Sequence, residues 1–476
     1  MASDSIQSQV KRLAHNGIAL AAGGIVAQLA FTLLEILIAR KLGADAYGVF
    51  VTAYAWTVLG AYLMEIGTPY WTIQEGSRTH DRLPELLGSG LTISLSMFAV
   101  LYILLVIVAT TLVSNPIISF MLILLPYGLI LTLQNHLSAV YASYQTMHVS
   151  AFYMGIAPVA ILVAYFFYSW QELTLPDVGF AFVVGSGIVT GAWFASTLRR
   201  VRPHVRPGSI KTALRGSYPY GLSGILFQVF FKADVVLISM LAGVHEAGIY
   251  AAAFKLVDLV GKVSVLAGRV FSPTIFKSSH ESEKSFQMFT GMMLRVMALA
   301  GLLAGVVSFV LAEELILLMF GENYAESVPV LRILGGVMAT MSMLFALQPL
   351  LSSIDLHFER VTGMVVAVVV HIGGCALLIP KYGATGAAIS TLFSGGLIIV
   401  LYAYFASRKR KFRFVQWLAL PSFLAATVAA ATVLADMSPY LGSVVAVAIF
   451  LASLLLTRFV HLDEIRFILQ SVAGKA

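Results

Sequence analysis

Long apolar stretches alternate with short polar segments along almost the entire chain. A membrane-spanning helix needs about 20 mostly apolar residues, and about fourteen stretches meet this requirement. These stretches are residues 17–40, 47–67, 86–112, 117–139, 150–170, 177–197, 218–241, 248–268, 289–311, 327–352, 361–379, 382–406, 414–434 and 441–459. The pattern predicts an all-α integral membrane protein of about fourteen transmembrane helices, with little mass outside the bilayer.

Composition supports this prediction. Hydrophobic residues make up 59% of the 476 positions and charged residues 11%, whereas about 25% of the residues in soluble domains are charged. The excess apolar surface is therefore expected to face lipid. The apolar stretch after the polar start is too long for the hydrophobic core of a cleavable signal peptide. We expect a multi-pass protein of the cell membrane, inner or plasma, whose first helix directs insertion.

The distribution of Lys and Arg predicts the topology. If the N-terminus is cytoplasmic, 22 of the 30 basic residues fall in inside segments, three in outside loops and five within spans. Cytoplasmic loops carry an excess of Lys and Arg, so the N- and C-termini are both expected in the cytoplasm. The Lys and Arg residues of these cytoplasmic segments account for the net charge of +7, so no nucleic-acid partner is expected.

The chain contains an internal repeat at an offset of 200 residues. Residues 24–48 and 224–248 share Gly24 with Gly224, Gln28 with Gln228, Phe31 with Phe231, Gly43 with Gly243, and Gly48 with Gly248. Six spans precede each copy, which predicts parallel repeats related by an axis along the membrane normal. We expect two pseudo-symmetric six-helix bundles, 1–197 and 218–406, joined by a basic cytoplasmic linker, 198–217. Residues 407–476 are expected to form two extra helices and a cytoplasmic tail.

Three segments carry a resemblance to a known family. The first two are ARKLGADAYGVF and its repeat SMLAGVHEAGIYAAAFKL, and the third, from Pro380 to Ser394, reads PKYGATGAAISTLFS. They resemble the multidrug/oligosaccharidyl-lipid/polysaccharide (MOP) exporter superfamily, and most of all its polysaccharide-flippase branch. The resemblance implies transport of a lipid-linked oligosaccharide. It also implies membrane lipids as partners, together with a polysaccharide polymerase or assembly proteins.

Charged and polar residues within the spans are candidate substrate ligands. In the eighth span, Lys255, Asp258 and Lys262 are spaced i, i+3, i+7 and share one helical face. The seventh span adds Lys232, and together the lysines suit the diphosphate of a lipid-linked sugar. The alternative is that Asp258 neutralises the two lysines of the eighth span and the charges only hold helices together. For the sugar hydroxyls we expect Gln28, Gln134 and Tyr141.

Energy coupling is expected to use an ion gradient. No phosphate-binding G-x-x-x-x-G-K-[ST] loop occurs in the sequence, although passive exchange remains open. The acids deepest in the spans are Glu35, Asp234 and Asp258, which makes them the candidate carriers of a proton or sodium ion. The one cysteine, Cys375, excludes a zinc site built on paired cysteines. We expect no bound metal and no cofactor.

Three further function classes compete with a flippase. An oligosaccharide ligase or polymerase is expected to need a large outer loop with catalytic Arg and His, whereas the longest outside loop, about 312–326, is short and acidic. We therefore expect no enzyme. A multidrug or cation antiporter of the same superfamily would favour an acidic cleft, which the three lysines oppose. A scaffold subunit would not need mid-membrane charges. The preferred prediction is alternating-access flipping of a polyprenyl-diphosphate oligosaccharide to the outer leaflet, for surface polysaccharide or glycan assembly.

Overall fold

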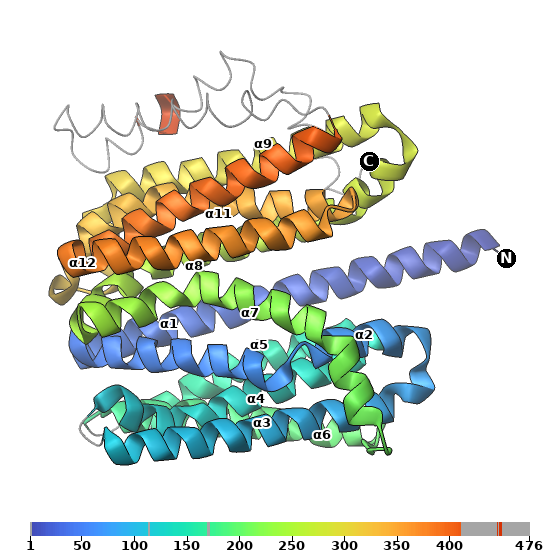
Figure 1. Cartoon of the computed structure of the whole chain (residues 1–476), viewed down its shortest axis with the longest axis horizontal. Helices are drawn as coiled ribbons and strands as arrows, with labels where there is room; N and C mark the ends of the chain where they lie inside the picture. Colours follow the sequence, from blue (N-terminus) through green and yellow to red (C-terminus); the bar gives the residue numbers. More distant parts are fainter. Residues whose placement is uncertain (1, 113–114, 169–171, 411–444, 446, 450–476) are drawn as a thin grey trace. The chain divides into compact units, whose positions relative to one another are not determined.

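A computed structural model describes residues 2–112, 115–168, 172–410, 445 and 447–449. Every regular element in these residues is helical (Figure 1), which confirms the all-α prediction. By length and composition, eight helices in the described part of the chain can cross a membrane. The two last predicted spans, 414–434 and 441–459, fall outside the described residues except at four positions, so the total of fourteen stays a prediction.

The helices form two compact units. In its described residues, the first unit, Met1–Gly248, contains seven α-helices and the start of an eighth. These are α1 (Ala2–Glu65), α2 (Thr68–Arg78), the 3-10 turn η1 (His80–Arg82), α3 (Leu83–Thr111), α4 (Pro116–Ser143), α5 (Met147–Tyr168), α6 (Leu175–Leu198), α7 (Ser209–Leu241) and the beginning of α8 (Val244–Glu281).

The second unit, Ile249–Ala476, begins inside α8. Its other described elements are α9 (Glu283–Val310), α10 (Ala312–Met319), the 3-10 turn η2 (Glu322–Tyr324), α11 (Ser327–Ser353) and α12 (His357–Lys409). This division follows packing, because α7 packs against α1, α2 and α3. The bundles 1–197 and 218–406 follow the sequence repeat instead, and they stay a prediction.

Glycines divide the two longest helices. α1 breaks at Gly43, where φ is 77°, and α12 breaks at Gly383, where φ is 53°. Only glycine adopts positive φ at little cost, so each break separates two straight arms. The arms correspond to the predicted span pairs 17–40 with 47–67 and 361–379 with 382–406. Each of the twelve spans predicted up to residue 406 therefore overlaps a described helix.

Small residues let the helices of the first unit approach closely. A Cβ atom added to Gly23 on α1 would lie 2.5 Å from the carbonyl oxygen of Ala151 on α5. An aromatic cluster fills the space between α1, α4 and α6. The ring centroids of Phe50 and Phe182 are 5.4 Å apart, and those of Tyr127 and Phe182 are 5.1 Å apart. Backbone proximity and van der Waals packing thus hold the unit together, as in membrane bundles generally.

The second unit uses the same kind of packing. Gly305 on α9 faces Gly335 on α11, and a Cβ on either glycine would lie within 2.4 to 2.8 Å of the other's carbonyl oxygen. Gly301, one turn earlier, faces Ser342 at a comparable distance. The Gly301-x-x-x-Gly305 spacing in the sequence predicts this close approach, and the structure confirms it.

Candidate functional site

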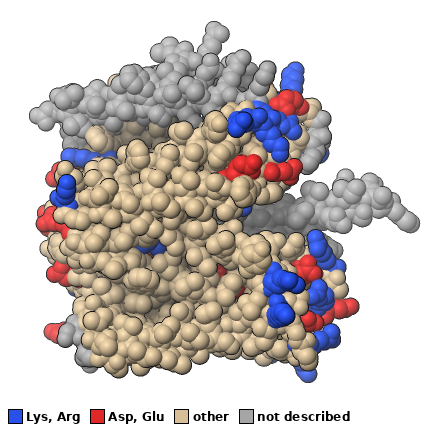
Figure 2. All heavy atoms as spheres, viewed as in Figure 1, with Lys and Arg blue, Asp and Glu red and all other residues tan. Residues whose placement is uncertain are grey.

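Charged side chains are unevenly distributed over the protein surface. On the face drawn in Figure 2, Lys, Arg, Asp and Glu gather near helix ends, while the helix middles are almost entirely uncharged. This is the surface expected of helices whose middles contact lipid. The few charges placed deep in the helices are therefore the first candidates for function.

The cationic face of α8 is the main candidate substrate site in the second unit. Lys255 is only 3% exposed, Asp258 is half-buried and Lys262 is exposed. The face therefore passes from the interior to the surface within two helical turns. It carries two lysines and one aspartate, so its net charge is positive.

Lys232 and Asp234 occupy different sides of α7 in the first unit. Asp234 is 1% exposed, and its Oδ1 accepts a hydrogen bond of 2.8 Å from the backbone N–H of Val235. Lys232 is half-buried. Side chains two positions apart on a helix point about 200° apart, so the different directions of Lys232 and Asp234 agree with their spacing in the sequence. The buried acid and the more accessible base cannot serve one contact together.

On α1, the two candidate residues lie on one face of the first arm. Gln28 donates a hydrogen bond of 3.2 Å from Nε2 to Thr32 Oγ1. Glu35, one turn further, is 7% exposed. The i, i+4, i+7 spacing thus places these polar groups in a row, with the acid at its more buried end.

Gln134 and Tyr141 lie in the interface between α4 and α6. Gln134 Nε2 donates to Thr190 Oγ1 at 2.8 Å and to Ser186 Oγ at 3.2 Å. The Tyr141 hydroxyl lies 3.4 Å from Ser196 Oγ, and Gln134 and Tyr141 are 7% and 2% exposed. Their polar atoms are engaged in helix packing. A role for them in sugar binding stays a prediction, and it would require α4 and α6 to part.

Sequence reasoning did not select Glu65 as an ion-coupling acid. Glu65 is 2% exposed and ends α1, and its Oε2 accepts a hydrogen bond of 3.0 Å from Asn135 Nδ2 on α4. Ile66 and Gly67 follow with φ of 43° and 74°. The sequence signal is the acid followed by the helix-breaking Gly67-Thr68-Pro69.

Near Glu65, the end of α1 contacts α7. The Tyr62 hydroxyl on α1 hydrogen-bonds the side chain of Gln228 on α7. A Cβ on Gly67 would lie 2.3 Å from the backbone nitrogen of Gly221, which leaves the two backbones in contact. Gln228 is the repeat equivalent of Gln28, so the shared glutamines have different partners in the two copies.

The basic linker lies along the start of α3. The backbone N–H of His204 donates to the Pro84 carbonyl at 3.1 Å, and Ser89 Oγ donates to Ser209 Oγ at 2.8 Å. Arg206 forms an ion pair of 3.5 Å with Glu85. The part of the linker before Ser209 thus packs against α3, whereas the rest of the predicted linker, 209–217, forms the start of α7.

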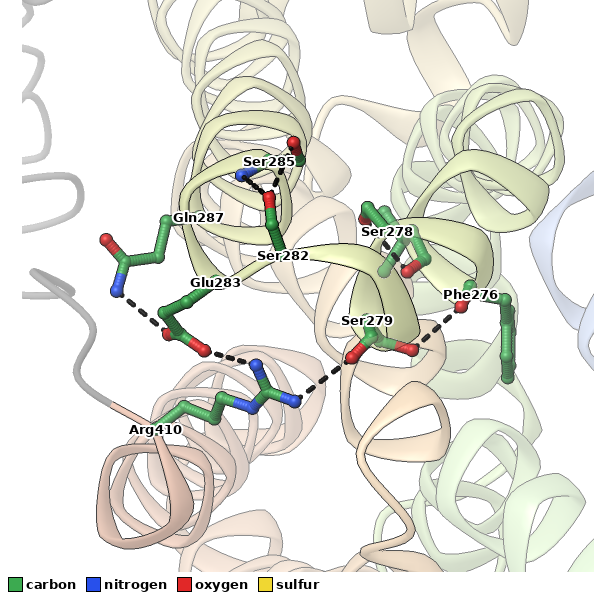
Figure 3. A network of polar contacts seen from close by, with 9 residues as sticks. Phe276, Ser278, Ser279, Ser282, Glu283, Ser285, Gln287 and Arg410 are labelled. Carbon is green, nitrogen blue, oxygen red and sulfur yellow. Dashed lines mark hydrogen bonds and ion pairs between the residues drawn. The ribbon is translucent and has the colours of Figure 1, made fainter.

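The end of α12 is tied to the turn between α8 and α9 in the second unit. Arg410 donates to the Glu283 carboxylate and, at 3.1 Å, to the Ser279 carbonyl (Figure 3). Its guanidinium also lies 4.9 Å from the centroid of the Phe286 ring. The neighbouring Lys409 donates to the Ile354 carbonyl, just after α11. These contacts join four helix ends, those of α8, α9, α11 and α12, into one group.

No resident metal centre is evident in the described residues, where no three His, Cys, Asp or Glu side chains gather. Cys375 is buried and unbonded to another cysteine. Its sulfur lies 3.8 Å from His371 Nε2, and Ser394 Oγ lies 3.3 Å from His371 Nδ1. These groups join the two arms of α12.

Curated relatives with similar sequences include two proteins of glycan assembly. The chain is 23% identical over 278 residues to the capsular polysaccharide biosynthesis protein CapF of Staphylococcus aureus, which covers 56% of this chain and 69% of CapF. It is also 23% identical over 256 residues to the probable low-salt glycan biosynthesis flippase Agl15 of Haloferax volcanii, covering 51% of this chain and 52% of Agl15.

Solved structures with the same fold are transport proteins. The lipid II flippase MurJ in an inward closed conformation superposes with a TM-score of 0.72 at 13% identity, covering 93% of this chain and 99% of MurJ. An inward-facing multidrug transporter of the MATE family gives a TM-score of 0.68 at 14% identity, covering 82% and 97%. The latter transporter is described as a member of the MOP superfamily.

The family assignment comes from the sequence. The model of the polysaccharide biosynthesis protein family matches residues 13–279, which is more than half of the chain and includes both copies of the repeat. The chain belongs to the polysaccharide biosynthesis protein family.

Proposed function

We propose that the protein flips a lipid-linked oligosaccharide, carried on a polyprenyl diphosphate, from the cytoplasmic to the outer leaflet by alternating access. The observation that carries the proposal is the cationic face of α8. A lysine in the middle of a membrane helix costs about 2.5–3.5 kcal/mol on insertion scales, and Lys255 is almost fully buried. The cost is offset when the lysine faces an acid or an anionic ligand.

Charge balance on this face favours an anion. The face carries two lysines and one aspartate, and Lys262 lies at its accessible end. A diphosphate supplies the opposite charge at the junction of sugar and lipid, while Lys provides a compact point charge on a flexible stem. The names of CapF, Agl15 and MurJ agree with a substrate of this class.

The energy for transport is assigned to an ion gradient. Glu35 and Asp234 are buried acids on α1 and α7, and Asp258 is a half-buried acid on α8. Such acids in membrane helices serve as proton or ion carriers in many transporters. We place the protein in the cell membrane with both termini in the cytoplasm, supplying a polysaccharide polymerase or assembly protein at the outer face.

The test is a flipping assay with purified protein in vesicles. The probe is a polyprenyl-diphosphate oligosaccharide with a fluorescent sugar, and flipping is the fraction that becomes inaccessible or accessible to a membrane-impermeant quencher. Lys255→Ala and Lys262→Ala each slow flipping, and the double variant slows it at least tenfold. Lys277→Ala, at an exposed position of the same helix, is the matched control and flips at the unmodified rate.

Two results would contradict the proposal. If the wild-type protein does not move the probe, a polyprenyl-diphosphate oligosaccharide is not its substrate. Wild-type activity of both single variants and the double variant, at equal protein levels, leaves the α8 face as a packing device.

The MATE-like fold supports a second candidate, an ion-coupled antiporter for cationic drugs. This candidate predicts that vesicles containing the protein accumulate a fluorescent organic cation when a proton or sodium gradient is imposed. Faster cation uptake in Lys255→Ala, with no flipping of the diphosphate lipid, would favour the antiporter over the flippase.

A further inference from the structure

The two copies of the repeat contact each other at equivalent glycines. A Cβ atom on Gly48 would lie 1.7 Å from the Val244 carbonyl oxygen, and a Cβ on Gly248 would lie 2.1 Å from the Ala44 carbonyl oxygen. The same hypothetical atoms would lie 3.1 and 3.2 Å from the backbone nitrogen of the opposite glycine. In both directions the obstacle is backbone, so only glycine fits at either position.

This contact is reciprocal. Residue 48 meets residue 244, and residue 248 meets residue 44, with each pair of equivalents separated by 200 positions. A contact in which each partner presents the same patch to the other is generated by a two-fold axis. The axis passes between Gly48 and Gly248, where the two backbones are closest.

The local backbone is also repeated. Gly43 has φ of 77° and Gly243 has φ of 99°, and each precedes a helical segment that starts within one residue. The second arm of α1 and the start of α8 thus bring their first turns together. Positive φ at both glycines turns the chain sharply, which brings residues 44–48 and 244–248 side by side.

One polar pair covers the glycine contact. Asp45 Oδ1 lies 2.9 Å from His245 Nδ1, and these residues are themselves repeat equivalents. Their side chains are 79% and 47% exposed. Because both groups are accessible to solvent, the pair is easily broken, whereas the buried backbone contact needs separation of the two segments.

We propose that Gly48 and Gly248 form the gate that closes the transport path at the outer end of the protein, with Asp45 and His245 as its latch. In a transporter built from parallel repeats the path follows the axis between them, and a backbone contact on that axis leaves no passage. The distribution of Lys and Arg assigns residues 40–48 to the outer side. The inference rests on alternating access in the proposed function, because only then does this end open and close.

The first experiment locks the gate. Asp45→Cys and His245→Cys are combined with Cys375→Ala, which removes the natural cysteine. In intact cells or right-side-out vesicles, oxidation closes a disulfide. It blocks labelling of both cysteines by a membrane-impermeant maleimide and stops flipping of the fluorescent polyprenyl-diphosphate oligosaccharide. Reduction restores labelling and flipping. The two single-cysteine variants are the controls, and in each of them oxidant leaves the flipping rate at the value measured in reductant.

The second experiment prevents closure. Gly48→Ala or Gly248→Ala places a methyl group against a backbone carbonyl, so the gate stays open and flipping falls at least tenfold. The control is Gly24→Ala on the same helix as Gly48, because a Cβ there meets no other atom within 4 Å. In Gly48→Ala, a cysteine at position 245 is labelled faster by the impermeant maleimide than in the unmodified background.

The outcomes separate the gate from the function itself. Absence of cross-linking, continued flipping in the cross-linked protein, or flipping by Gly48→Ala at the rate of Gly24→Ala overturns the gate. Labelling of positions 45 and 245 only from the cytoplasmic side overturns its assignment to the outer end. If the unmodified protein does not move the probe while the cysteines still cross-link, the proposed function fails and the closed contact stands. If the alanine variants do not fold, the cross-linking experiment still tests the gate, because positions 45 and 245 are exposed and tolerate substitution.

Discussion

Polar residues on α4 and on α8 follow the same helical spacing, yet they meet different surroundings. On α4, Gln134 and Tyr141 are buried and hydrogen-bonded to hydroxyl groups of α6. On α8, Lys255 is buried, while Asp258 and Lys262 lie progressively nearer the surface. Spacing shows which residues share a face, but the neighbouring helix decides whether that face is a packing surface or a binding surface.

The largest expected effect follows from reversing the charge on α8. Lys255→Glu replaces the buried cation with an anion beside Asp258, and we expect flipping to fall about 30-fold or more. Disrupting a buried charge interaction costs about 2–5 kcal/mol, and about 1.4 kcal/mol corresponds to a tenfold change. The flipping assay measures the effect, and Lys255→Arg, which keeps the charge, retains most of the activity. Equal activity of the two variants would remove the distinction between the α4 and α8 faces.

Neutralising the buried acid on α7 is expected to have the next largest effect. Asp234→Asn keeps the shape of the side chain and its acceptor for the Val235 N–H but can no longer lose a proton. Flipping in an imposed proton or sodium gradient is expected to drop to the rate measured without a gradient, a change of several-fold. Asp81→Asn, at an exposed acid, keeps its response to the gradient. An undiminished response of Asp234→Asn would exclude this acid from coupling.

On α4, the expected effect is on stability. Gln134→Leu removes two interhelical hydrogen bonds and leaves Thr190 and Ser186 with fewer partners. Such bonds in membrane proteins contribute about 0.6 kcal/mol each on average and about 1.7 kcal/mol at most. We expect a lower thermal denaturation temperature in detergent, with nearly normal flipping per folded molecule. Normal stability combined with lost flipping would transfer Gln134 to the substrate site.

The smallest effect is expected for Tyr141→Phe. The hydroxyl is 3.4 Å from each of Ser196 Oγ and Thr197 Oγ1, at the long limit for a hydrogen bond between oxygens. The ring, with Arg200 placed 5.6 Å from its centroid, is retained. The free energy of unfolding should fall by less than about 1 kcal/mol, measured by denaturation in detergent. A tenfold loss of flipping at unchanged stability would show that the hydroxyl binds sugar.

The fold was predictable because membrane helices depend on local properties. A run of about 20 apolar residues forms a spanning helix whatever its neighbours are, and Gly43 and Gly383 mark sharp turns because positive φ favours glycine. The repeat offset also placed Gly48 and Gly248 at equivalent positions. That these two glycines touch was not predictable from either segment alone, since the contact depends on how the two copies are arranged.

The candidate site was less predictable because it depends on contacts between distant positions. Asn135 contacts Glu65 across 70 residues of sequence, and Gln134 contacts Thr190 across 56. A single sequence shows that each of these residues is polar and lies in a span. It does not show which helix lies opposite. Burial of Lys255 agrees with its mid-span position, whereas the burial of Glu65 depends on α4 covering the end of α1.

The contacts at the end of α12 have a mechanical consequence. Arg410 joins α12 to the turn between α8 and α9, and Lys409 joins it to the carbonyl that follows α11 (Figure 3 shows the Arg410 contacts). A cation beside a helix C-terminus is also favoured by the helix dipole. A load applied to one of these helix ends is shared by all four. These helix ends of the second unit are therefore expected to move together, and bending of α12 is expected at the break at Gly383.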